Sequence, residues 1–390
     1  MTAFDIVSPD AIQSGDATDA YFNRTVETLE HADRNPHVVA EVTASQFPSG
    51  DWGLFAGLKD AIHLLAGRDI DVDALPEGTL FDGGPVMRLE GQYLEFCRLE
   101  TSLLGFLSHA TGMATAALEA RQAAPDATML SFGSRHVHPS IAAMLERSAL
   151  IAGLDGFSHV AAGEVLNREA SGTMPHALVI CFGRGNQETA WQAFDEAVDP
   201  DVPRIALCDT YSDEVEESLR AADAIPDLDG VRIDTTGSRR GDFHHILREL
   251  RWKLDEHGHD SIDIFASGGI DPQTIREVRD VVDGFGVGSY ISNADPCNFA
   301  LDIVELDGES AVKRGKLGGR KQVYRTPDGG HEVLPVDEYS TGESRLEPMI
   351  RDGDIVHEFD LDATTARALD DARRVGFGTS DHQTRDSAKF

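Results

Sequence analysis

The sequence predicts an α/β protein whose largest part is an irregular (β/α) barrel of about six or seven parallel strands, joined to an α+β domain. From Thr128 to Ser292, short apolar runs alternate with helix-length amphipathic segments, the pattern of parallel strands with helical crossovers. Each unit takes roughly 25–30 residues, which suits a closed or nearly closed barrel better than an open doubly wound sheet. Strand-like alternation on both sides of this region predicts the additional, antiparallel domain.

Residues 1–123 are expected to form the N-terminal α+β domain and a linking helix. The elements expected here are strands at Val38–Val42, Trp52–Phe55 and Val86–Tyr93, a helix at Leu58–Ala66 and a long helix from Glu100 to about Ala123. The apolar residues of the long helix recur at three- and four-residue spacing, so one face is expected to be buried. Near the start, Tyr21 follows residues that suit a helix start, and it is either half-buried beside a helix cap or exposed to a ligand.

Residues 124–293 are expected to form the barrel, and residues 294–390 to return and complete the sheet of the first domain. The barrel strands expected are Met129–Phe132, Ala177–Cys181, Ile205–Cys208, Val231–Asp234, Ile262–Ala266 and Gly284–Gly288. The helices expected end near Ile151, Ala197, Ala224, His257 and Val282, with a short one after Phe157–Val160. Residues 378–390 are polar and are expected to fray.

The net charge of −34 is the most unusual property of the composition. The acidic residues are spread along the chain, and a dispersed acidic surface stays hydrated but repels itself unless salt screens it. We therefore expect adaptation to a high-salt cytoplasm, against the simpler alternative of an acidic protein without a special habitat. Because no basic stripe is available to meet phosphates, nucleic acid is not expected as a partner.

Cysteine usage and hydropathy favour a reduced cytoplasm. The four cysteines lie far apart and none forms a C-x-x-C pair, which argues against a cysteine zinc site and against a disulfide framework. No apolar run approaches the roughly 20 residues that span a membrane. The N-terminal residues have neither a basic nor an apolar signal region. We expect no membrane partner.

Two glycine-containing corners follow successive strands near the end of the barrel region. In barrels the last two strand–helix loops often bind phosphate through backbone N–H groups, and glycine lets the backbone approach an anion. The simpler reading of each corner is a turn. The residues predicted to bind phosphate are Ser267, Gly268, Gly269, Gly286, Gly288 and Ser289.

Asp209 and Asp234 lie one strand–helix unit apart, where two predicted strands end. A pair of carboxylates there can hold ribose hydroxyls or Mg²⁺, although Asp209 could also cap the next helix. Arg232 precedes Asp234 by two residues, so both side chains point to the same side of the strand. Charged groups facing the inside of a barrel need partners or a ligand, because burying an unpaired charge is costly.

Arg135 lies in the exit loop of the first barrel strand and could bind a carboxylate or phosphate with its forked guanidinium. The nearby histidines His136, His138 and His159 have no acidic or cysteine ligand at helical spacing, so zinc is not expected. His176, before the predicted strand Ala177–Cys181, could be a nucleophile or general base, or a hydrogen-bonded loop histidine.

Two absences exclude other chemistries. No lysine lies between Lys59 and Lys253, so no barrel strand offers a Schiff-base lysine of the class I aldolase type. No G-x-G-x-x-G opens a helix and no G-x-x-x-x-G-K-[ST] is present, which disfavours dinucleotide and P-loop sites.

Taken together, these segments resemble the nicotinate phosphoribosyltransferase family in its shorter, archaeal form. The resemblance runs from Asp16 to about Arg325, and each segment is common alone but specific in this order. The matching segments are Thr18–Tyr21, Glu95–Ala116, Phe132–Arg135, Gly172–His176, Asp209–Ser212, Val231–Asp234, Ser267–Gly269 and Phe285–Gly288. The resemblance implies a type II phosphoribosyltransferase fold and a homodimer, or larger homo-oligomer, whose sites are completed by the neighbouring subunit.

The resemblance also implies roles for single residues. Tyr21 would come from the partner and stack on the pyridine ring opposite Phe132, and His176 matches the histidine that family members phosphorylate with ATP. Arg135 and Arg232 would face the nicotinate carboxylate or the phosphates, and which arginine meets which group stays open. Asp209 would hold the ribose side and is the one side chain that could meet the magnesium, and Asp234 would lie near the base. The glycine corners would take the 5′-phosphate.

The reaction implied is formation of nicotinate mononucleotide and pyrophosphate from nicotinate and phosphoribosyl pyrophosphate, with Mg²⁺ on the pyrophosphate and coupling to ATP hydrolysis. Two departures matter. Residues 314–333 lack the cysteines of the zinc motif that some archaeal members carry, so no zinc is expected, and Ser158 stands where a nicotinamide-using branch has Asp. The alternatives are a decarboxylating quinolinate phosphoribosyltransferase, which needs more cations, and a non-catalytic nucleotide sensor.

Overall fold

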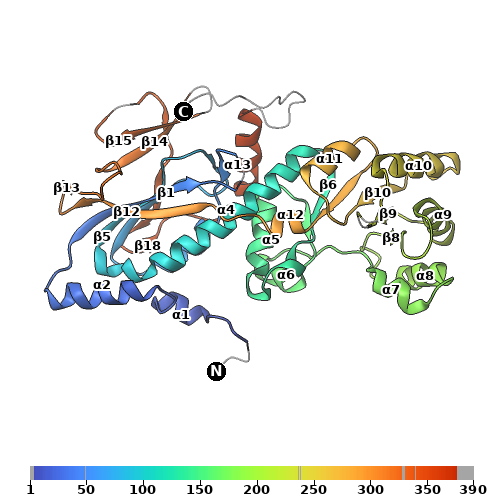
Figure 1. Cartoon of the computed structure of the whole chain (residues 1–390), viewed down its shortest axis with the longest axis horizontal. Coiled ribbons are helices and arrows are strands. Elements are labelled where there is room, and N and C mark those ends of the chain that lie inside the picture. Colours follow the sequence, from blue (N-terminus) through green and yellow to red (C-terminus); the bar gives the residue numbers. More distant parts are fainter. Residues whose placement is uncertain are drawn as a thin grey trace. The chain divides into compact units, whose positions relative to one another are not determined.

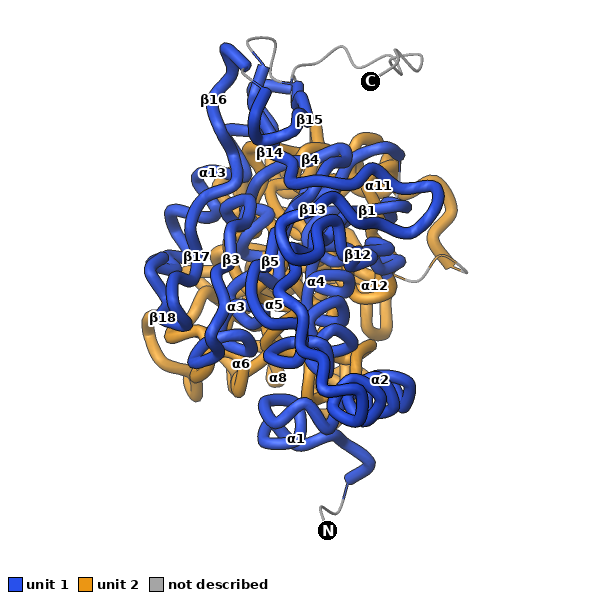
Figure 2. Tube along the Cα trace, turned by 90° about the vertical axis from the view of Figure 1, so that its left-hand side faces the viewer, with its two compact units in different colours: residues 1–118, 150–153, 294–390 blue, residues 119–149, 154–293 orange. Residues whose placement is uncertain are grey.

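The computed structural model describes residues 4–48, 50–235, 237, 239–326, 330–338 and 340–375. They form two compact units, one from residues 1–118, 150–153 and 294–390, the other from residues 119–149 and 154–293 (Figures 1 and 2). The expected fraying of residues 378–390 lies outside the described residues.

The first unit is built on a seven-stranded antiparallel sheet in the order β13-β12-β1-β5-β3-β17-β18. These strands are β1 (His37–Gln46), β3 (Ile70–Ala74), β5 (Pro85–Gln92), β12 (Asn298–Leu306), β13 (Glu309–Ser310), β17 (Glu347–Arg351) and β18 (Asp354–Ile355). C-terminal strand β12 pairs with β1 and β17 pairs with β3, so the end of the chain supplies strands to the N-terminal sheet.

Helices α1 (Pro9–Ser14), α2 (Ala20–His31), α3 (Leu58–Leu65), α13 (Leu361–Arg374) and most of α4 (Glu100–Ala123) belong to the same unit. α3 is amphipathic, and its apolar side chains enter the core with those of β1, β3 and β5. Two small sheets accompany them: β2 (Gly53–Leu54) with β4 (Leu80–Phe81), and β14 (Lys321–Arg325) between β15 (His331–Pro335) and β16 (Glu343–Ser344). Buried Asp371 of α13 pairs with Arg325 and Arg345, which ties α13 to the β14 sheet.

The second unit contains a six-stranded, wholly parallel sheet in the order β7-β6-β11-β10-β9-β8 (Figure 1). Its strands are β6 (Thr128–Ser131), β7 (Gly156–Phe157), β8 (Ile205–Leu207), β9 (Gly230–Ile233), β10 (Asp263–Ala266) and β11 (Gly284–Val287). Most of the residues in the central strands are buried, as expected when helices cover both faces of a parallel sheet.

Helices connect these strands, and aspartates begin several of them. Asp213, Asp242 and Asp271 accept hydrogen bonds from backbone N–H groups in the first turns of α9, α10 and α11, which fixes where each strand-end loop stops. The helices of this part are α5 (Ala142–Ile151), α6 (Val160–Leu166), α7 (His176–Phe182), α8 (Gln187–Ala197), α9 (Glu214–Ala224), α10 (Phe243–Glu256), α11 (Pro272–Val278) and α12 (Ser289–Ser292).

One predicted strand is wrong. Ala177–Cys181 lies inside helix α7, which begins at His176 directly after Pro175. A short apolar run cannot by itself be assigned to strand or helix, and proline suits the start of a helix. Only Val179 of this helix is buried, whereas a central parallel strand would be buried on both faces.

This correction explains the form of the sheet. The segment between β7 and β8 contains helices α6, α7 and α8, and β7 and β8 are the two edge strands. No strand among the described residues joins these edges, so the sheet is a half-barrel of six strands rather than a closed or nearly closed barrel.

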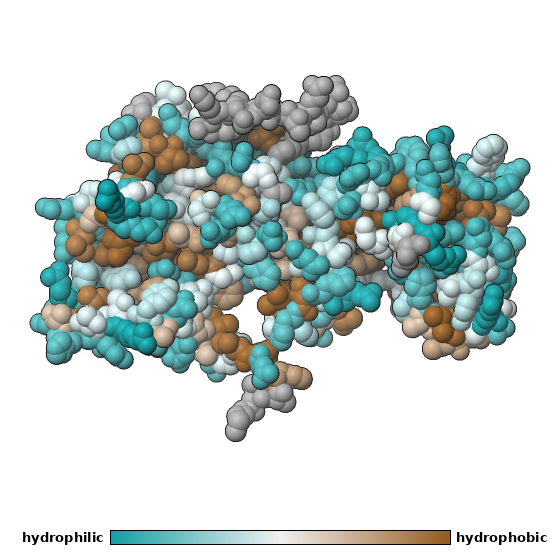
Figure 3. Space-filling model, in the orientation of Figure 1, coloured by the Kyte–Doolittle hydropathy of each residue, from teal (hydrophilic) through white to brown (hydrophobic). Residues whose placement is uncertain are grey.

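Figure 3 shows mainly hydrophilic residues on the visible face, with apolar side chains in small groups between them. Trp252, at 72% exposure, and Leu317, at 78%, are among the exposed large apolar side chains. Among the described helices, none combines the length and the apolar character needed to cross a bilayer.

Candidate active site

The carboxyl ends of the parallel strands carry most of the residues predicted for the site. Parallel strands place these ends at one edge of the sheet, so residues distant in sequence meet there. In the order of the sheet, Ser158 follows β7, Phe132 and Arg135 follow β6, Gly286 to Ser289 end β11, Ser267 to Gly269 follow β10, Asp234 follows β9 and Asp209 follows β8.

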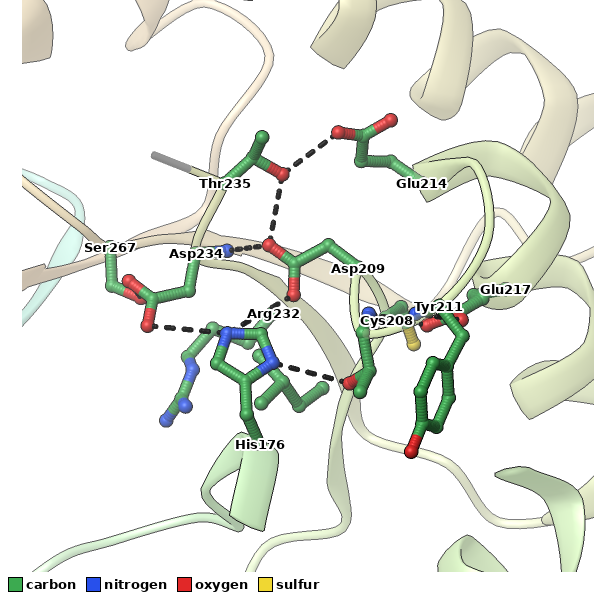
Figure 4. Close-up of polar contacts among 12 residues, drawn as sticks. His176, Cys208, Asp209, Tyr211, Glu214, Glu217, Arg232, Asp234, Thr235 and Ser267 are labelled. Atoms are coloured by element: carbon green, nitrogen blue, oxygen red, sulfur yellow. Dashed lines mark hydrogen bonds and ion pairs between the residues drawn. The ribbon is translucent and has the colours of Figure 1, made fainter. Parts of the chain in front are cut away.

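His176, Asp209 and Asp234 meet at the end of this edge formed by β8 and β9. The imidazole of His176 points between the two carboxylates, with Nε2 3.6 Å from Oδ1 of Asp209 and 3.7 Å from Oδ2 of Asp234 (Figure 4). Its Nδ1 lies 3.2 Å from the hydroxyl oxygen of Thr210. Polar groups therefore lie at both ring nitrogens, a hydroxyl at Nδ1 and two carboxylates near Nε2.

Asp209 is the buried carboxylate of the pair, with 7% of the residue exposed. Its Oδ2 accepts hydrogen bonds from the backbone N–H of Asp234, at 2.7 Å, and from the hydroxyl of Thr235, at 2.9 Å. Its Oδ1, which faces His176, has no hydrogen-bond partner among the described residues. Burial raises the pKa of Asp209, while the Thr235 hydrogen bond and His176 oppose this rise.

Arg232 is anchored to the segment that carries His176. Its guanidinium donates to the hydroxyl of Thr173, three residues before His176, and, at 3.0 Å, to the carbonyl oxygen of Met174, two residues before it. The carbon of the guanidinium lies 5.8 Å from the centre of the Phe132 ring. Burial lowers the pKa of Arg232, and the carboxylates of Asp234 and Asp209 oppose this effect. Its Nε–H has no partner among the described residues.

The two glycine corners are tightly packed against other site residues. Gly268 has a φ of +82°, and a Cβ there would lie 2.5 Å from Oδ1 of Asp234, which also accepts a hydrogen bond from the Ser267 hydroxyl at 3.0 Å. A Cβ on Gly286 would lie 2.4 Å from the ring of Phe132. Glycine is therefore required at these two positions by close approach to Asp234 and Phe132.

The loop after β8 has backbone N–H groups that are already occupied. The carboxylate of Glu217, fully buried in α9, accepts from the N–H groups of Thr210, Tyr211 and Ser212 at 2.8–2.9 Å and from the Gln187 amide at 3.1 Å. Consecutive N–H groups of this kind can bind a phosphate, but here an internal carboxylate holds them. The loop therefore presents Asp209 and Thr210 rather than free N–H groups for an anion.

Three predicted residues are not brought into this group of contacts. Arg135 lies in a 3₁₀ turn (Ser134–His136) and is exposed, and the described residues give it no ion pair. Ser158 donates its backbone N–H to Ser131, which extends the β6–β7 pairing, and it is partly exposed. Tyr21 belongs to the other unit, on α2, where it is 55% exposed and contacts Phe22.

The structure adds residues that the sequence did not single out. Thr235 links Asp209 to Glu214, and Glu217 holds the β8 loop. Arg240 lies 3.8 Å over the ring of Phe243 and donates to the carbonyl oxygens of Thr235 and Gly268. Part of this was visible in the sequence, because Thr235 follows Asp234 directly and Glu217 stands in the first turn of the helix after Asp209. Such a position does not show whether the side chain caps a helix or forms a hydrogen bond with a residue of the site.

A buried carboxylate lies behind the Phe132 loop. Glu146 of α5 is fully buried, and neither of its carboxylate oxygens completes a hydrogen bond to a donor among the described residues. Burial raises the pKa of Glu146 to about 7, although the nearby hydroxyls of Ser131 and Ser134 oppose this rise. Ser131 ends β6 and Ser134 lies between Phe132 and Arg135, so this acid lies beside the predicted binding loop.

We expect Glu146→Gln to remove a pH-dependent loss of stability. Because the pKa of Glu146 is raised in the folded state, its ionisation does not lower stability at pH values below the unfolded-state pKa. As pH rises from there toward 7, its ionisation destabilises the fold progressively. The shift corresponds to a loss on the order of 3 kcal/mol above pH 7. The free energy of unfolding of the variant, measured with denaturant at pH 5 and at pH 8, should rise relative to that of wild type when the pH is raised from 5 to 8. The exposed Glu249→Gln is the matched control, and an equal gain there would contradict the assignment.

Metal ligands do not gather anywhere in the described part of the chain: no group of three or more His, Cys, Asp or Glu side chains is arranged to hold an ion. All four cysteines are free thiols, with Cys97, Cys208 and Cys297 buried and Cys181 exposed.

Comparison with known proteins identifies relatives for nearly the whole chain. Two family models match in succession, the quinolinate phosphoribosyl transferase N-terminal domain over residues 19–111 and its C-terminal domain over residues 113–302. A nicotinate phosphoribosyltransferase of Mycobacterium tuberculosis is 32% identical over 270 residues, and one of Bacillus subtilis is 31% identical over 273 residues. Each alignment covers 65% of this chain, and the chain spans only 59% and 54% of the two relatives.

Among solved structures, the nicotinate-nucleotide pyrophosphorylase of Pyrococcus furiosus is 45% identical, with a TM-score of 0.93 over 96% of this chain and 99% of that one. Human nicotinic acid phosphoribosyltransferase has a TM-score of 0.74 at 19% identity, over 92% of this chain and 94% of that one, and so shares the fold.

Proposed function

The chain belongs to the nicotinate phosphoribosyltransferase family, and from that premise we propose that it forms nicotinate mononucleotide and pyrophosphate from nicotinate and phosphoribosyl pyrophosphate. One observation carries the proposal: the His176 imidazole lies between the carboxylates of Asp209 and Asp234, at the sheet edge that also carries Ser267–Gly269. A phosphosugar transfer needs negative charge near the developing oxocarbenium ion and an anion site for the phosphate.

The 5′-phosphate is assigned to the corners at Ser267–Gly269 and Gly286–Ser289. The N–H groups of the β8 loop are bound by Glu217, which favours the other two loops for an anion. Arg240 supports this assignment, because it donates to the carbonyl oxygen of Gly268 and so brings a cation beside this corner.

The pyridine ring is assigned to the face of Phe132. Arg232 lies against Phe132 and is held by the His176 segment, so we propose that it meets the nicotinate carboxylate, with Ser158 at the rim of the same pocket. Exposed Arg135 is then proposed to bind the substrate phosphates. Tyr21 is proposed to reach the site of a second copy in a homodimer, stacking on the ring opposite Phe132.

His176 is the proposed acceptor of a phosphoryl group from ATP, and Asp209 and Asp234 are the carboxylates that hold it. Mg²⁺ is proposed to enter with the pyrophosphate, where it supplies Lewis-acid stabilisation of the leaving group. The described residues offer at most paired aspartates rather than a larger ligand set, which fits an ion held mainly by the substrate.

The competing function is decarboxylating quinolinate phosphoribosyl transfer, which the names of the two matching family models favour. A second carboxylate on the ring needs further cations, and none of the six lysines lies between Lys59 and Lys253. A non-catalytic nucleotide sensor is the other alternative, and turnover alone separates it from an enzyme.

Turnover of labelled substrates tests the proposal directly. Purified protein is supplied with phosphoribosyl pyrophosphate, Mg²⁺ and either carboxyl-labelled nicotinate or carboxyl-labelled quinolinate, with and without ATP, in high salt. We expect labelled nicotinate mononucleotide from nicotinate and a higher yield with ATP. Release of labelled carbon dioxide from quinolinate, or binding of both substrates without pyrophosphate release, would reject the proposed function.

We expect Arg135→Ala to weaken substrate binding without weakening the fold. Arg135 is exposed and makes no ion pair in the described structure, so its loss should leave the melting temperature within about 2 °C. The KM for phosphoribosyl pyrophosphate should rise about tenfold, since one charge-assisted contact is lost. Arg248→Ala, which removes an equally exposed arginine from the middle of α10, is the control. If only the KM for nicotinate changed, Arg135 would be assigned to binding nicotinate rather than the phosphates.

A further inference from the structure

Glu214 is a buried carboxylate that lies next to the site but is not needed to begin its helix. It is the first residue of α9, and the adjacent Asp213 caps that helix by accepting from the N–H groups of Val215 and Glu216. Only 7% of Glu214 is exposed. Burying a carboxylate costs free energy unless it is hydrogen-bonded, so its position calls for a partner.

That partner is Thr235. Its hydroxyl oxygen lies 2.8 Å from Oε1 of Glu214 and 2.9 Å from Oδ2 of Asp209, which places it between the two carboxylates (Figure 4). It is the one hydrogen-bond partner that the described residues give to the Glu214 carboxylate. A threonine hydroxyl has one hydrogen and two lone pairs. The hydroxyl can donate its single hydrogen to only one of the two carboxylates at a time, so the two contacts together limit the rotamers of Thr235.

The consequence reaches His176 through Asp209. With Oδ2 held by Thr235 and by the Asp234 N–H, the carboxylate plane is fixed and Oδ1 is directed at Nε2 of His176. The Thr235 hydroxyl also contacts Glu214, which limits its rotamer, and the Thr235 carbonyl oxygen accepts from Nε of Arg240. A short chain of contacts thus runs from α9 through Thr235 to the oxygen that faces the imidazole.

We propose that Glu214 and Thr235 are positioning residues for the transfer reaction, and that Glu214 acts only through Thr235 to orient Asp209. This inference rests on the proposed function for the reaction that it supports. Neither residue contacts His176, so neither is a catalytic residue. Outer hydrogen-bond partners of this kind change activity by about 10–100-fold in other sites.

Each residue offers a disruptive and a conservative variant. Thr235→Val removes the hydroxyl at nearly constant volume, and Thr235→Ser keeps it. Glu214→Ala removes the carboxyl group, and Glu214→Gln keeps an oxygen and a donor near Thr235. We expect the disruptive variants to lower kcat about 10–100-fold with KM changed less than about threefold, and the conservative ones to stay within about threefold of wild type.

The double variant Thr235→Val/Glu214→Ala is the decisive measurement. If Glu214 acts only through Thr235, adding Glu214→Ala to Thr235→Val should change kcat no further, whereas independent structural losses would add. Additive losses, a rise in KM alone, or a Thr235→Ser variant as impaired as Thr235→Val would overturn the proposal.

A readout without substrate separates this inference from the proposed function. The imidazole resonances of His176, assigned by their absence in His176→Gln, report the adjacent carboxylates whatever reaction the protein performs. We expect Thr235→Val to shift these resonances and Thr235→Ser to leave them close to wild type. Unchanged resonances in Thr235→Val would overturn the positioning role, while wild type without nicotinate turnover would overturn only the function.

Discussion

Asp209→Asn is expected to lower kcat about 10²–10⁴-fold while the protein stays folded. Asparagine has the same shape, so its carbonyl oxygen can still accept from the Asp234 N–H and the Thr235 hydroxyl. Its amide nitrogen would then face His176 in place of the unpartnered Oδ1, and the negative charge beside the imidazole and the reacting sugar is lost. Steady-state pyrophosphate release measures the effect.

The same substitution should not destabilise the fold. Burial already raises the pKa of Asp209, which shows that its charged form is held at a cost, and a neutral amide avoids that cost. The melting temperature is expected to equal or exceed that of wild type. Asp213→Asn is the matched control, because it makes the same change four residues later at an exposed helix cap that asparagine fills well. An Asp209→Asn variant with more than about a tenth of wild-type kcat would remove Asp209 from the catalytic residues.

Strand ends are a strong constraint, so the sequence could predict which residues lie together at the carboxyl edge of the sheet. A short apolar run followed by Asp or by Ser-Gly-Gly predicts both where a parallel strand stops and what it presents at the sheet edge. Asp209 and Asp234 were predicted from β8 and β9 in this way, and the structure joins them through the hydrogen bond from the Asp234 N–H. Their proximity follows from β8 and β9 being neighbours in the sheet.

The helix that carries His176 could not be predicted by the same reasoning. Ala-Leu-Val-Ile-Cys is typical of a buried strand by composition, and periodicity over five residues does not distinguish helix from strand. The tertiary structure decides: this segment lies between β7 and β8 in the chain, adds no strand to the sheet, and has only Val179 buried. His176 was predicted at the start of a strand, and in the structure it begins α7. In both cases it closely follows Thr173 and Met174, which Arg232 binds.

The hydrogen-bond partners of the buried carboxylates could not be predicted from the sequence either. Glu214 and Glu217 stand in the first turn of α9, where acidic residues are common because the helix dipole favours them. Only the fold shows that Glu217 turns back to three N–H groups of its own loop and that Glu214 reaches across to the next strand end. Which hydrogen bonds a carboxylate at a helix terminus makes therefore depends on the loop that packs next to it in the fold.

Gly268→Ala is expected to damage both stability and activity. The left-handed φ of +82° costs an alanine about 1–2 kcal/mol, and its Cβ would lie 2.5 Å from Oδ1 and 3.0 Å from the backbone oxygen of Asp234. Because backbone cannot yield as a flexible side chain can, overpacking should add about 1–3 kcal/mol. Displacing Asp234 by about 1 Å should lower kcat/KM about 10²-fold.

Gly269→Ala separates these two causes. Gly269 has nearly the same conformation, with φ +71°, but a Cβ there would meet nothing within 4 Å, so it bears the backbone cost alone. Denaturant unfolding should place Gly269→Ala about 1–2 kcal/mol below wild type and Gly268→Ala clearly lower. If the two variants lose equal stability, the contact with Asp234 is not tight. If Gly269→Ala nevertheless loses affinity for phosphoribosyl pyrophosphate, its Cβ occupies the space left for the phosphate, which is the result expected when backbone N–H groups of this corner bind the anion.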